Sequence, residues 1–175
     1  MADAVALRSG PSAGLQRVAT ARLIALLLPM ALLGGALGSQ YLGGLHPCEM
    51  CYWQRWPHGV AMGLAVIAFT APVGSRNCRV ATLLAALAIA TSGAIGVYHA
   101  GVEAKIFEGF TQCTATVHPG ISNAELLQQL VHAPIVRCDE VQFRFLGISM
   151  AGWNAILSLG GAALIVALVL RGKRA

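Results

Sequence analysis

The sequence predicts an all-α membrane protein in which four transmembrane helices pack as a bundle. Only 11% of its residues are charged and 57% are apolar, which is far from the composition of a water-soluble domain. Charged residues are also absent from four long stretches, at residues 23–48, 56–75, 80–102 and 145–170. Each stretch can supply the ~20 apolar residues with which a helix crosses ~30 Å of hydrocarbon. Strands are a poor alternative, because these stretches are continuously apolar rather than alternating.

We therefore expect one membrane domain over residues 20–170, with helices at about 20–43, 56–73, 80–100 and 148–170. Residues 1–19 and 171–175 are predicted to be cytoplasmic tails. The first apolar stretch has an alternative interpretation as a cleaved signal peptide, since Ala36-Leu37-Gly38 resembles a signal-peptidase site. That stretch continues past Gly38 and is longer than the ~7–15 apolar residues of a usual signal peptide. A retained helix is the better interpretation.

Basic residues predict how the bundle is oriented. Eight of them share one predicted side with a single acid, Asp3: Arg8, Arg17, Arg22, Arg76, Arg79, Arg171, Lys173 and Arg174. The other side combines four basic residues with six acidic ones. Both termini should therefore be cytoplasmic, with external loops at about 44–55 and 102–147. This sorting accounts for the net charge of +5, and no nucleic-acid partner is expected.

The sequence Cys48-Glu49-Met50-Cys51 lies where the first external loop meets the second helix. A helix N-terminus stabilises anions, so a thiolate here should have a lowered pKa. Arg55 follows Cys51 at the i, i+4 spacing and shares its helix face. Its guanidinium could support a thiolate or a reduced oxygen on a ligand. Alternatively, Arg55 only extends its charged end to the membrane interface.

Two more cysteines, Cys113 and Cys138, lie in the second external loop, whereas Cys78 falls in the cytoplasmic turn and is expected to be a spectator. Four external cysteines allow three disulfide pairings. Cys113 and Cys138 could form a redox pair or a plain staple of the loop. Cross-pairing with the first two cysteines would be expected as a transient species in an electron relay.

The Cys48/Cys51 pair has an alternative interpretation as part of a metal site. Zinc would need two more ligands, for which His46 and His118 are candidates, but the chain has no second tight ligand pair. We therefore expect no metal. His99, near the outer end of the third helix, is either an interfacial hydrogen-bonding group or a ligand contact.

The second external loop contains a predicted short helix. Ser122-Asn123-Ala124-Glu125 has the form of a capping box. Apolar side chains then follow on one side, at Leu126, Leu127, Leu130 and Val131. We expect an amphipathic helix that lies on the membrane surface or packs as a cap over the bundle.

Together these residues resemble the DsbB family, the quinone-dependent disulfide bond formation proteins of bacterial inner membranes. The resemblance rests on Pro47-Cys48-x-x-Cys51-x-x-x-Arg55, on Cys113 with Cys138, and on the segment 142–150 leading into Trp153. It spans about residues 20–170. Four cysteines in this order among four helices are a fairly specific signal.

The resemblance implies a quinone-dependent protein-disulfide oxidoreductase of the inner membrane, with its cysteine loops in the periplasm. A reduced DsbA-like partner would attack the Cys113–Cys138 disulfide at Cys113, and electrons would then pass to Cys48 and Cys51. Cys51 would contact ubiquinone or menaquinone as a thiolate, and the quinone would reach it through the membrane lipid.

The resemblance further implies that Arg55 holds the quinone. His99 falls near a histidine that lies by the quinone in this family. Gln54 occupies a place where some relatives carry an acid, and the spacing around Cys113 also differs from that of the best-known members.

Two rival functions remain open at this point. A vitamin K epoxide reductase-like enzyme also has four helices and two cysteine pairs. There, however, the CxxC pair follows the loop cysteines, whereas here it precedes them. A non-enzymatic membrane scaffold with stapled external loops is the rival from another class, and it predicts no quinone reduction.

Overall fold

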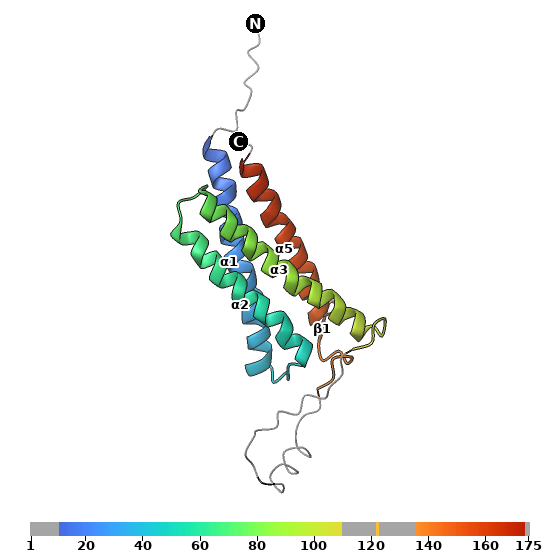
Figure 1. Ribbon diagram of the computed structural model, residues 1–175. Coiled ribbons are helices and arrows are strands. Elements are labelled where there is room, and N and C mark those ends of the chain that lie inside the picture. The colour runs from blue at the N-terminus through green and yellow to red at the C-terminus, as the bar shows by residue number, and fades with distance from the viewer. Residues whose placement is uncertain (1–10, 110–121, 123–135, 174–175) are drawn as a thin grey trace.

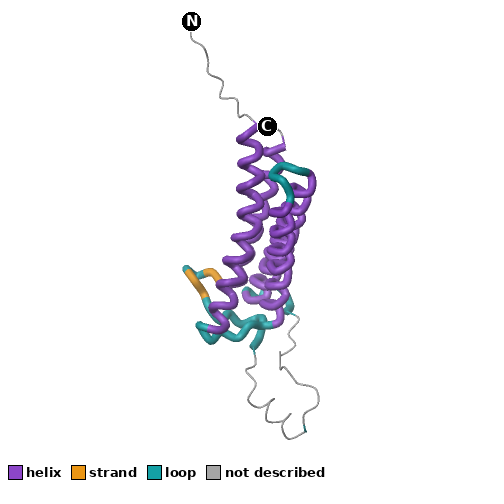
Figure 2. Tube along the Cα trace, turned by 90° about the vertical axis from the view of Figure 1, so that its left-hand side faces the viewer, coloured by secondary structure: helices purple, strands orange, loops and turns teal. Residues whose placement is uncertain are grey.

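The computed structural model describes residues 11–109, 122 and 136–173. Its long elements are the helices α1 (Pro11–Tyr41), α2 (Glu49–Thr70), α3 (Arg76–Glu103) and α5 (Met150–Lys173). They lie alongside one another as an elongated bundle (Figure 1), and the view at right angles shows the same arrangement (Figure 2). A small antiparallel hairpin of β1 (Arg144–Phe145) and β2 (Ile148–Ser149) leads into α5. The expected mostly helical fold is confirmed.

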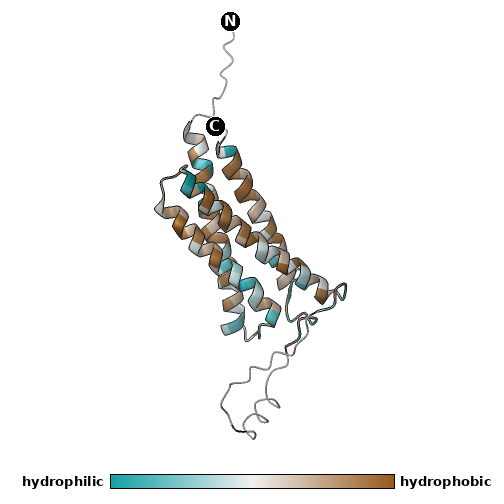
Figure 3. Cartoon of the chain, in the orientation of Figure 1, coloured by the Kyte–Doolittle hydropathy of each residue, from teal (hydrophilic) through white to brown (hydrophobic). Residues whose placement is uncertain are grey.

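Three of these helices are long and apolar enough to cross a membrane, over Ala13–Tyr41, Arg76–Glu103 and Met150–Gly172. All four helices expose large apolar side chains on their outer surfaces, for example Leu27, Val66, Leu87 and Leu164. Figure 3 shows these apolar stretches along the helices, with hydrophilic residues gathered toward the ends of the bundle. The chain therefore fits a multi-pass membrane protein. A membrane crossing by α2, whose first turns are polar, stays a prediction.

The helices extend beyond the predicted spans. α1 begins at Pro11 rather than near residue 20, and proline is favoured in the first turn of a helix. α2 begins at Glu49, before the predicted span at 56–73 but in agreement with the expected helix start beside Cys51. The reason is physical: a gap in charge marks the part of a helix that lipid tolerates, and a helix continues into polar flanks wherever a cap supports it. The predicted amphipathic helix after Ser122 lies outside the described residues.

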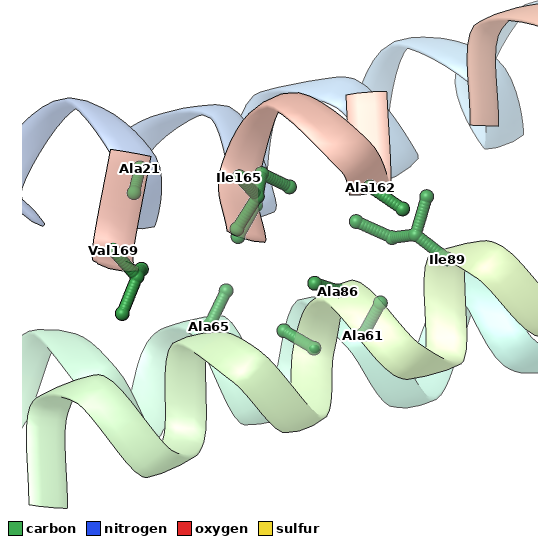
Figure 4. Close-up of a cluster of buried hydrophobic side chains, with 10 residues drawn as sticks. Ala21, Ala61, Ala65, Ala86, Ile89, Ala162, Ile165 and Val169 are labelled. Atoms are coloured by element: carbon green, nitrogen blue, oxygen red, sulfur yellow. The ribbon is translucent and has the colours of Figure 1, made fainter. Parts of the chain in front are cut away.

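Small residues form the centre of the bundle. Its buried cluster consists of Ala21, Ala25, Ala61, Ala65, Ala85, Ala86, Ile89, Ala162, Ile165 and Val169 (Figure 4). Alanine lets helix backbones approach closely, which is how helices gain packing energy in lipid. One close approach lies beside Gly96, where an added Cβ would lie 3.0 Å from the backbone oxygen of Ala151. α3 and α5 thus meet almost backbone to backbone near the end of the bundle that carries the CxxC pair.

The two ends of the bundle differ in charge. The start of α1, the turn 71–75 and the end of α5 lie at one end (Figure 1). Arg17 donates a hydrogen bond to the carbonyl of Arg171 over 3.4 Å there, and Arg79 donates one to the carbonyl of Gly172 over 3.3 Å. Arg17, Arg79 and Arg171, which are expected on one side of the membrane, therefore share one end of the fold. The CxxC pair and the hairpin lie at the opposite end.

Candidate redox site

Cys48 and Cys51 lie at the N-terminus of α2. Cys48 is the N-cap residue, and its Sγ accepts a hydrogen bond from the backbone N–H of Cys51 over 3.3 Å. The two Sγ atoms are 2.8 Å apart. Cys48 is buried and Cys51 is half-buried, and both are free thiols in this structure. The predicted dithiol at a helix N-terminus is therefore present, with its sulfurs close enough to form a disulfide after a small movement.

The thiols of Cys48 and Cys51 differ in pKa. Both residues lie outside the predicted membrane span, which begins at residue 56. The hydrogen bond from Cys48 lowers the pKa of the Cys51 thiol, and Arg55 lowers it further against the opposing effect of burial. The same hydrogen bond, together with burial, raises the pKa of the Cys48 thiol. In the reduced pair, Cys51 is therefore the more acidic thiol and Cys48 the less acidic one.

Cys138 comes from a segment 90 residues further along the chain, yet it packs against Cys48. The Sγ atoms of both cysteines and a ring nitrogen of His99 all lie within 4.8 Å of one another. Cys48, Cys138 and His99 are all buried. The fold thus places one predicted loop cysteine directly beside the CxxC pair. Cys113 lies outside the described residues.

Charged side chains hold the Cys138 segment in place. Asp139 accepts hydrogen bonds from Lys105 Nζ at 2.6 Å and from Arg137 Nη2 at 2.7 Å. These two cations hold the pKa of the Asp139 carboxyl well below its usual range. Gln142 also donates to the carbonyl of His46 over 2.6 Å, which ties the segment to the loop before Cys48. The segment is therefore docked on both the end of α3 and the α1–α2 loop.

Asp139→Asn is expected to slow the formation of a Cys48–Cys138 disulfide by about two- to fivefold, the effect of losing exposed ion pairs. The test compares oxidation rates in a background that lacks Cys51 and Cys113. Glu140→Gln is the matched control, because Glu140 is exposed and lies 3.8 Å from Arg137 Nε. Equal rates for the two variants would show that the ion pairs do not position Cys138.

Arg55 is turned toward α1 rather than outward. Its Nη1 donates to Gln40 Oε1, and its Nη2 donates to the carbonyl of Ala36 over 3.2 Å. Its guanidinium also lies 5.1 Å from the ring centre of Tyr52. These contacts hold the cation inside the bundle beside Cys51, which disfavours the simple interfacial role. The sequence analysis did not identify Gln40 as a partner of Arg55. The only indication in the sequence is a polar amide side chain within an apolar stretch.

A cavity of about 590 Å³ opens beside these groups. Its polar wall includes Cys51, Arg55 and His99, the three residues predicted to contact a cofactor. Its apolar wall comes largely from α1, through residues such as Leu32 and Leu33. The volume lies within the ~300–1,000 Å³ range of small-molecule sites. A flat, mostly apolar ring with polar oxygens would match such a lining.

A polar cluster that the sequence did not predict as a unit borders the cavity, and Gln54, His58 and Asn154 from this cluster line its wall. It consists of Gln54, His58, Ser92, Asn154 and Ser158, with His99 at its edge. The only sequence signal was the presence of polar residues within the charge-free stretches. Polar side chains at membrane depth are costly and are usually functional.

The same end of the bundle also offers ligands to a metal ion. Cys48, Cys138 and His99 present two sulfurs and one nitrogen within 4.8 Å of one another, a donor set that suits zinc when the thiols are reduced. Of the zinc ligands considered from the sequence, which were Cys48, Cys51, His46 and His118, this group contains only Cys48. His46 is not in the group, and His118 lies outside the described residues.

Comparison with known proteins gives a consistent result. The chain matches the family model described as disulfide bond formation protein DsbB over residues 18–168. It is 31% identical over 143 residues to disulfide bond formation protein B 1 of Burkholderia lata, covering 80% of each chain. It is 32% identical over 141 residues to disulfide bond formation protein B of Burkholderia ambifaria, covering 79% of each. It is 28% identical over 162 residues to disulfide bond formation protein B of Chromohalobacter salexigens, covering 86% of this chain and 92% of the relative. No solved structure matches.

Proposed function

Because the chain belongs to the DsbB family of disulfide bond formation proteins, we propose that it reoxidises a DsbA-like periplasmic protein and passes the electrons to a membrane quinone. Family membership supports a disulfide-forming oxidoreductase of the inner membrane. The observation that carries the finer proposal is that Cys138 packs against Cys48, while Cys48, Cys51 and Arg55 line one cavity.

The proposed topology has four membrane crossings, both termini in the cytoplasm and both cysteine loops in the periplasm. The outward apolar side chains of α2, such as Val60 and Ile67, support a crossing by this helix too. The basic residues gathered at the other end of the bundle support the orientation. DsbA-like proteins work in the periplasm, so this topology places the cysteine loops on the side of the partner.

The first half of the relay oxidises the partner. A partner thiolate attacks Cys113 of the Cys113–Cys138 disulfide, and Cys138 leaves as a thiolate. Cys138 then attacks Cys48 of the Cys48–Cys51 disulfide, and Cys51 leaves as a thiolate. The proximity of Cys138 to Cys48 supports this exchange. Cys51 is the better leaving group because its pKa is lowered.

The second half returns the cysteines to their disulfides. The partner's second thiol releases the oxidised partner from the mixed disulfide and frees the Cys113 thiolate. Cys113 attacks Cys138, and Cys48 leaves as a thiolate. Closing the Cys48–Cys51 disulfide then releases two electrons, which together with two protons convert quinone to quinol.

The cavity beside Cys51 suits the quinone. The Arg55 guanidinium can donate hydrogen bonds to an oxygen that gains negative charge on reduction. The apolar wall from α1 suits the ring of either ubiquinone or menaquinone. Cys51, as the thiolate of the reduced pair, lines the same cavity.

A direct test mixes the detergent-purified protein with a reduced DsbA-like protein and ubiquinone without oxygen, and follows the absorbance of the quinone. The expected result is one quinol formed for each partner disulfide formed. The scaffold alternative predicts only the background rate. Quinone reduction at background with all five cysteines intact would overturn the proposal.

Cys78→Ala is expected to leave this turnover unchanged. Cys78 is buried in the first turn of α3, next to Ser75, at the opposite end of the bundle from Cys48. Removing its sulfur should cost about 1 kcal/mol or less of folding free energy, because a small buried group is lost. The measurements are quinone turnover and thermal unfolding. A large loss of turnover in a well-folded variant would show that the fifth cysteine takes part.

A further inference from the structure

A chain of buried hydrogen bonds crosses the bundle and ends at Cys48. Ser158 Oγ donates to Asn154 Oδ1 over 2.9 Å, and Asn154 Nδ2 donates to Gln54 Oε1 over 2.8 Å. Gln54 Nε2 lies 2.8 Å from His99 Nδ1. His99 Nε2 lies 3.6 Å from Cys48 Sγ. Polar groups of α5, α2 and α3 thus connect in series to the relay sulfur.

Backbone carbonyls fix the direction of this chain. A carbonyl can only accept, and Asn154 Nδ2 bonds the carbonyl of Ser92 over 3.2 Å, so this atom is the amide nitrogen. Gln54 Nε2 likewise bonds the carbonyl of Met50 over 3.2 Å. Both amide orientations therefore follow from partners that have no hydrogen to give. Gln54 presents its oxygen to Asn154 and its N–H to His99.

The direction of the chain sets the hydrogen on His99. Nδ1 accepts from Gln54, so the neutral imidazole carries its hydrogen on Nε2. The Nε2 atom lies 3.6 Å from Cys48 Sγ and 3.9 Å from Glu103 Oε1. The single N–H on Nε2 therefore faces Cys48 Sγ, Glu103 and the backbone of Cys138, with which His99 also hydrogen-bonds, and this side of the ring has no free lone pair. This geometry suits a donor to sulfur and does not suit a base.

We propose that His99, held by Gln54 and Asn154, donates a hydrogen bond from Nε2 to the Cys48 thiolate as that sulfur leaves the Cys48–Cys138 disulfide. The inference rests on the proposed function and assigns His99 to the sulfur relay rather than to the quinone. In this step the Cys113 thiolate forms a bond to Cys138, the Cys48–Cys138 bond breaks, and its electron pair goes to Cys48. No proton is transferred. A donor aimed in advance at the developing charge lowers the cost of the step.

The decisive variant is His99→Leu, compared with Arg55→Gln. Without its donor, Cys48 should leave about ten- to a hundredfold more slowly, the usual effect of losing a hydrogen bond to a charged group. The Cys48–Cys138 disulfide should then accumulate in samples quenched with acid during turnover, while KM for ubiquinone changes by less than about twofold. Arg55→Gln should show the reverse pattern, with a raised KM and no accumulation.

Gln54→Met tests the positioning role, since methionine matches glutamine in length but cannot orient the imidazole. It should show the same accumulation in a weaker form. Ser158→Ala is the control, because it removes only the far end of the chain and should leave turnover and accumulation unchanged. Thermal unfolding checks that all four variants are folded.

Nitrogen-15 NMR of histidine-labelled protein provides a readout that does not depend on turnover. The wild-type spectrum should place the hydrogen of neutral His99 on Nε2. A hydrogen on Nδ1 would overturn the proposal, as would a His99→Leu variant that raises KM without accumulating the disulfide. If the wild-type protein itself reduced no quinone, the proposed function would fail, while the position of this hydrogen would still decide whether Gln54 sets the donor.

Discussion

Replacing Cys138 with serine is expected to abolish turnover with a DsbA-like partner, by at least about a thousandfold, as the loss of a catalytic nucleophile does. A hydroxyl at this position cannot carry the sulfur exchange between Cys113 and Cys48. The same variant should still reduce quinone when a small dithiol is supplied, because that reagent can reduce the Cys48–Cys51 disulfide directly. The measurement is the rate of quinol formation with each of the two electron donors.

Cys51→Ser is the complementary variant. It should form no quinol with either electron donor, since no thiolate then faces the cavity. The contrast separates the entry of electrons at Cys138 from their exit at Cys51. Full turnover of Cys138→Ser with the protein partner would exclude the relay in the order given above. A loss of both reactions in Cys138→Ser would instead show that Cys138 is needed at the quinone end.

Arg55→Gln is expected to raise KM for ubiquinone by about ten- to a hundredfold, as the loss of a charge-assisted hydrogen bond does. The KM for the partner should change little, because the Cys138 segment is docked by other residues. A second effect concerns pH. Arg55 lowers the pKa of Cys51, so its removal raises that pKa toward the ordinary value of about 8.5 and reduces the thiolate fraction at neutral pH.

Alkylation of Cys51 should therefore shift to higher pH in Arg55→Gln, in a background without the other external cysteines. Gln40→Ala is the graded control, because it removes one anchor of the guanidinium but keeps its charge. It should shift both KM and the alkylation profile in the same direction by a smaller amount. An unchanged dependence on quinone in Arg55→Gln would remove this residue from the quinone site.

The helices could be predicted from the sequence because lipid imposes a simple rule on composition: charge is excluded over ~20 residues. The CxxC pair and Arg55 could be predicted because their relation is local, within one turn of one helix. The ends of α1 and α2 could not. Capping depends on single side chains, such as the Sγ of Cys48, which continue a helix beyond the lipid boundary.

The contacts between segments that are distant in the sequence could not be predicted either. The sequence allows the external cysteines to cross-pair but does not single out Cys138 with Cys48, and it gives no sign that Asn154 meets Gln54, 100 residues away. Such pairs depend on how α2, α3 and α5 rotate and on the close approach at Gly96. A single polar residue in an apolar stretch indicates that a buried partner exists but does not say which one.

Cys48 and Cys138 expose only 2% and 3% of their surface. A glutathione-sized reductant that collides with the protein cannot touch either sulfur. In the proposed relay, a thiol delivered by the chain's own second loop reaches them, whereas, among the described cysteines of this site, a small thiol from solution can enter only at half-buried Cys51. Burial of these two sulfurs therefore limits which thiol donors can reduce the quinone, independently of the reduction potential of each donor.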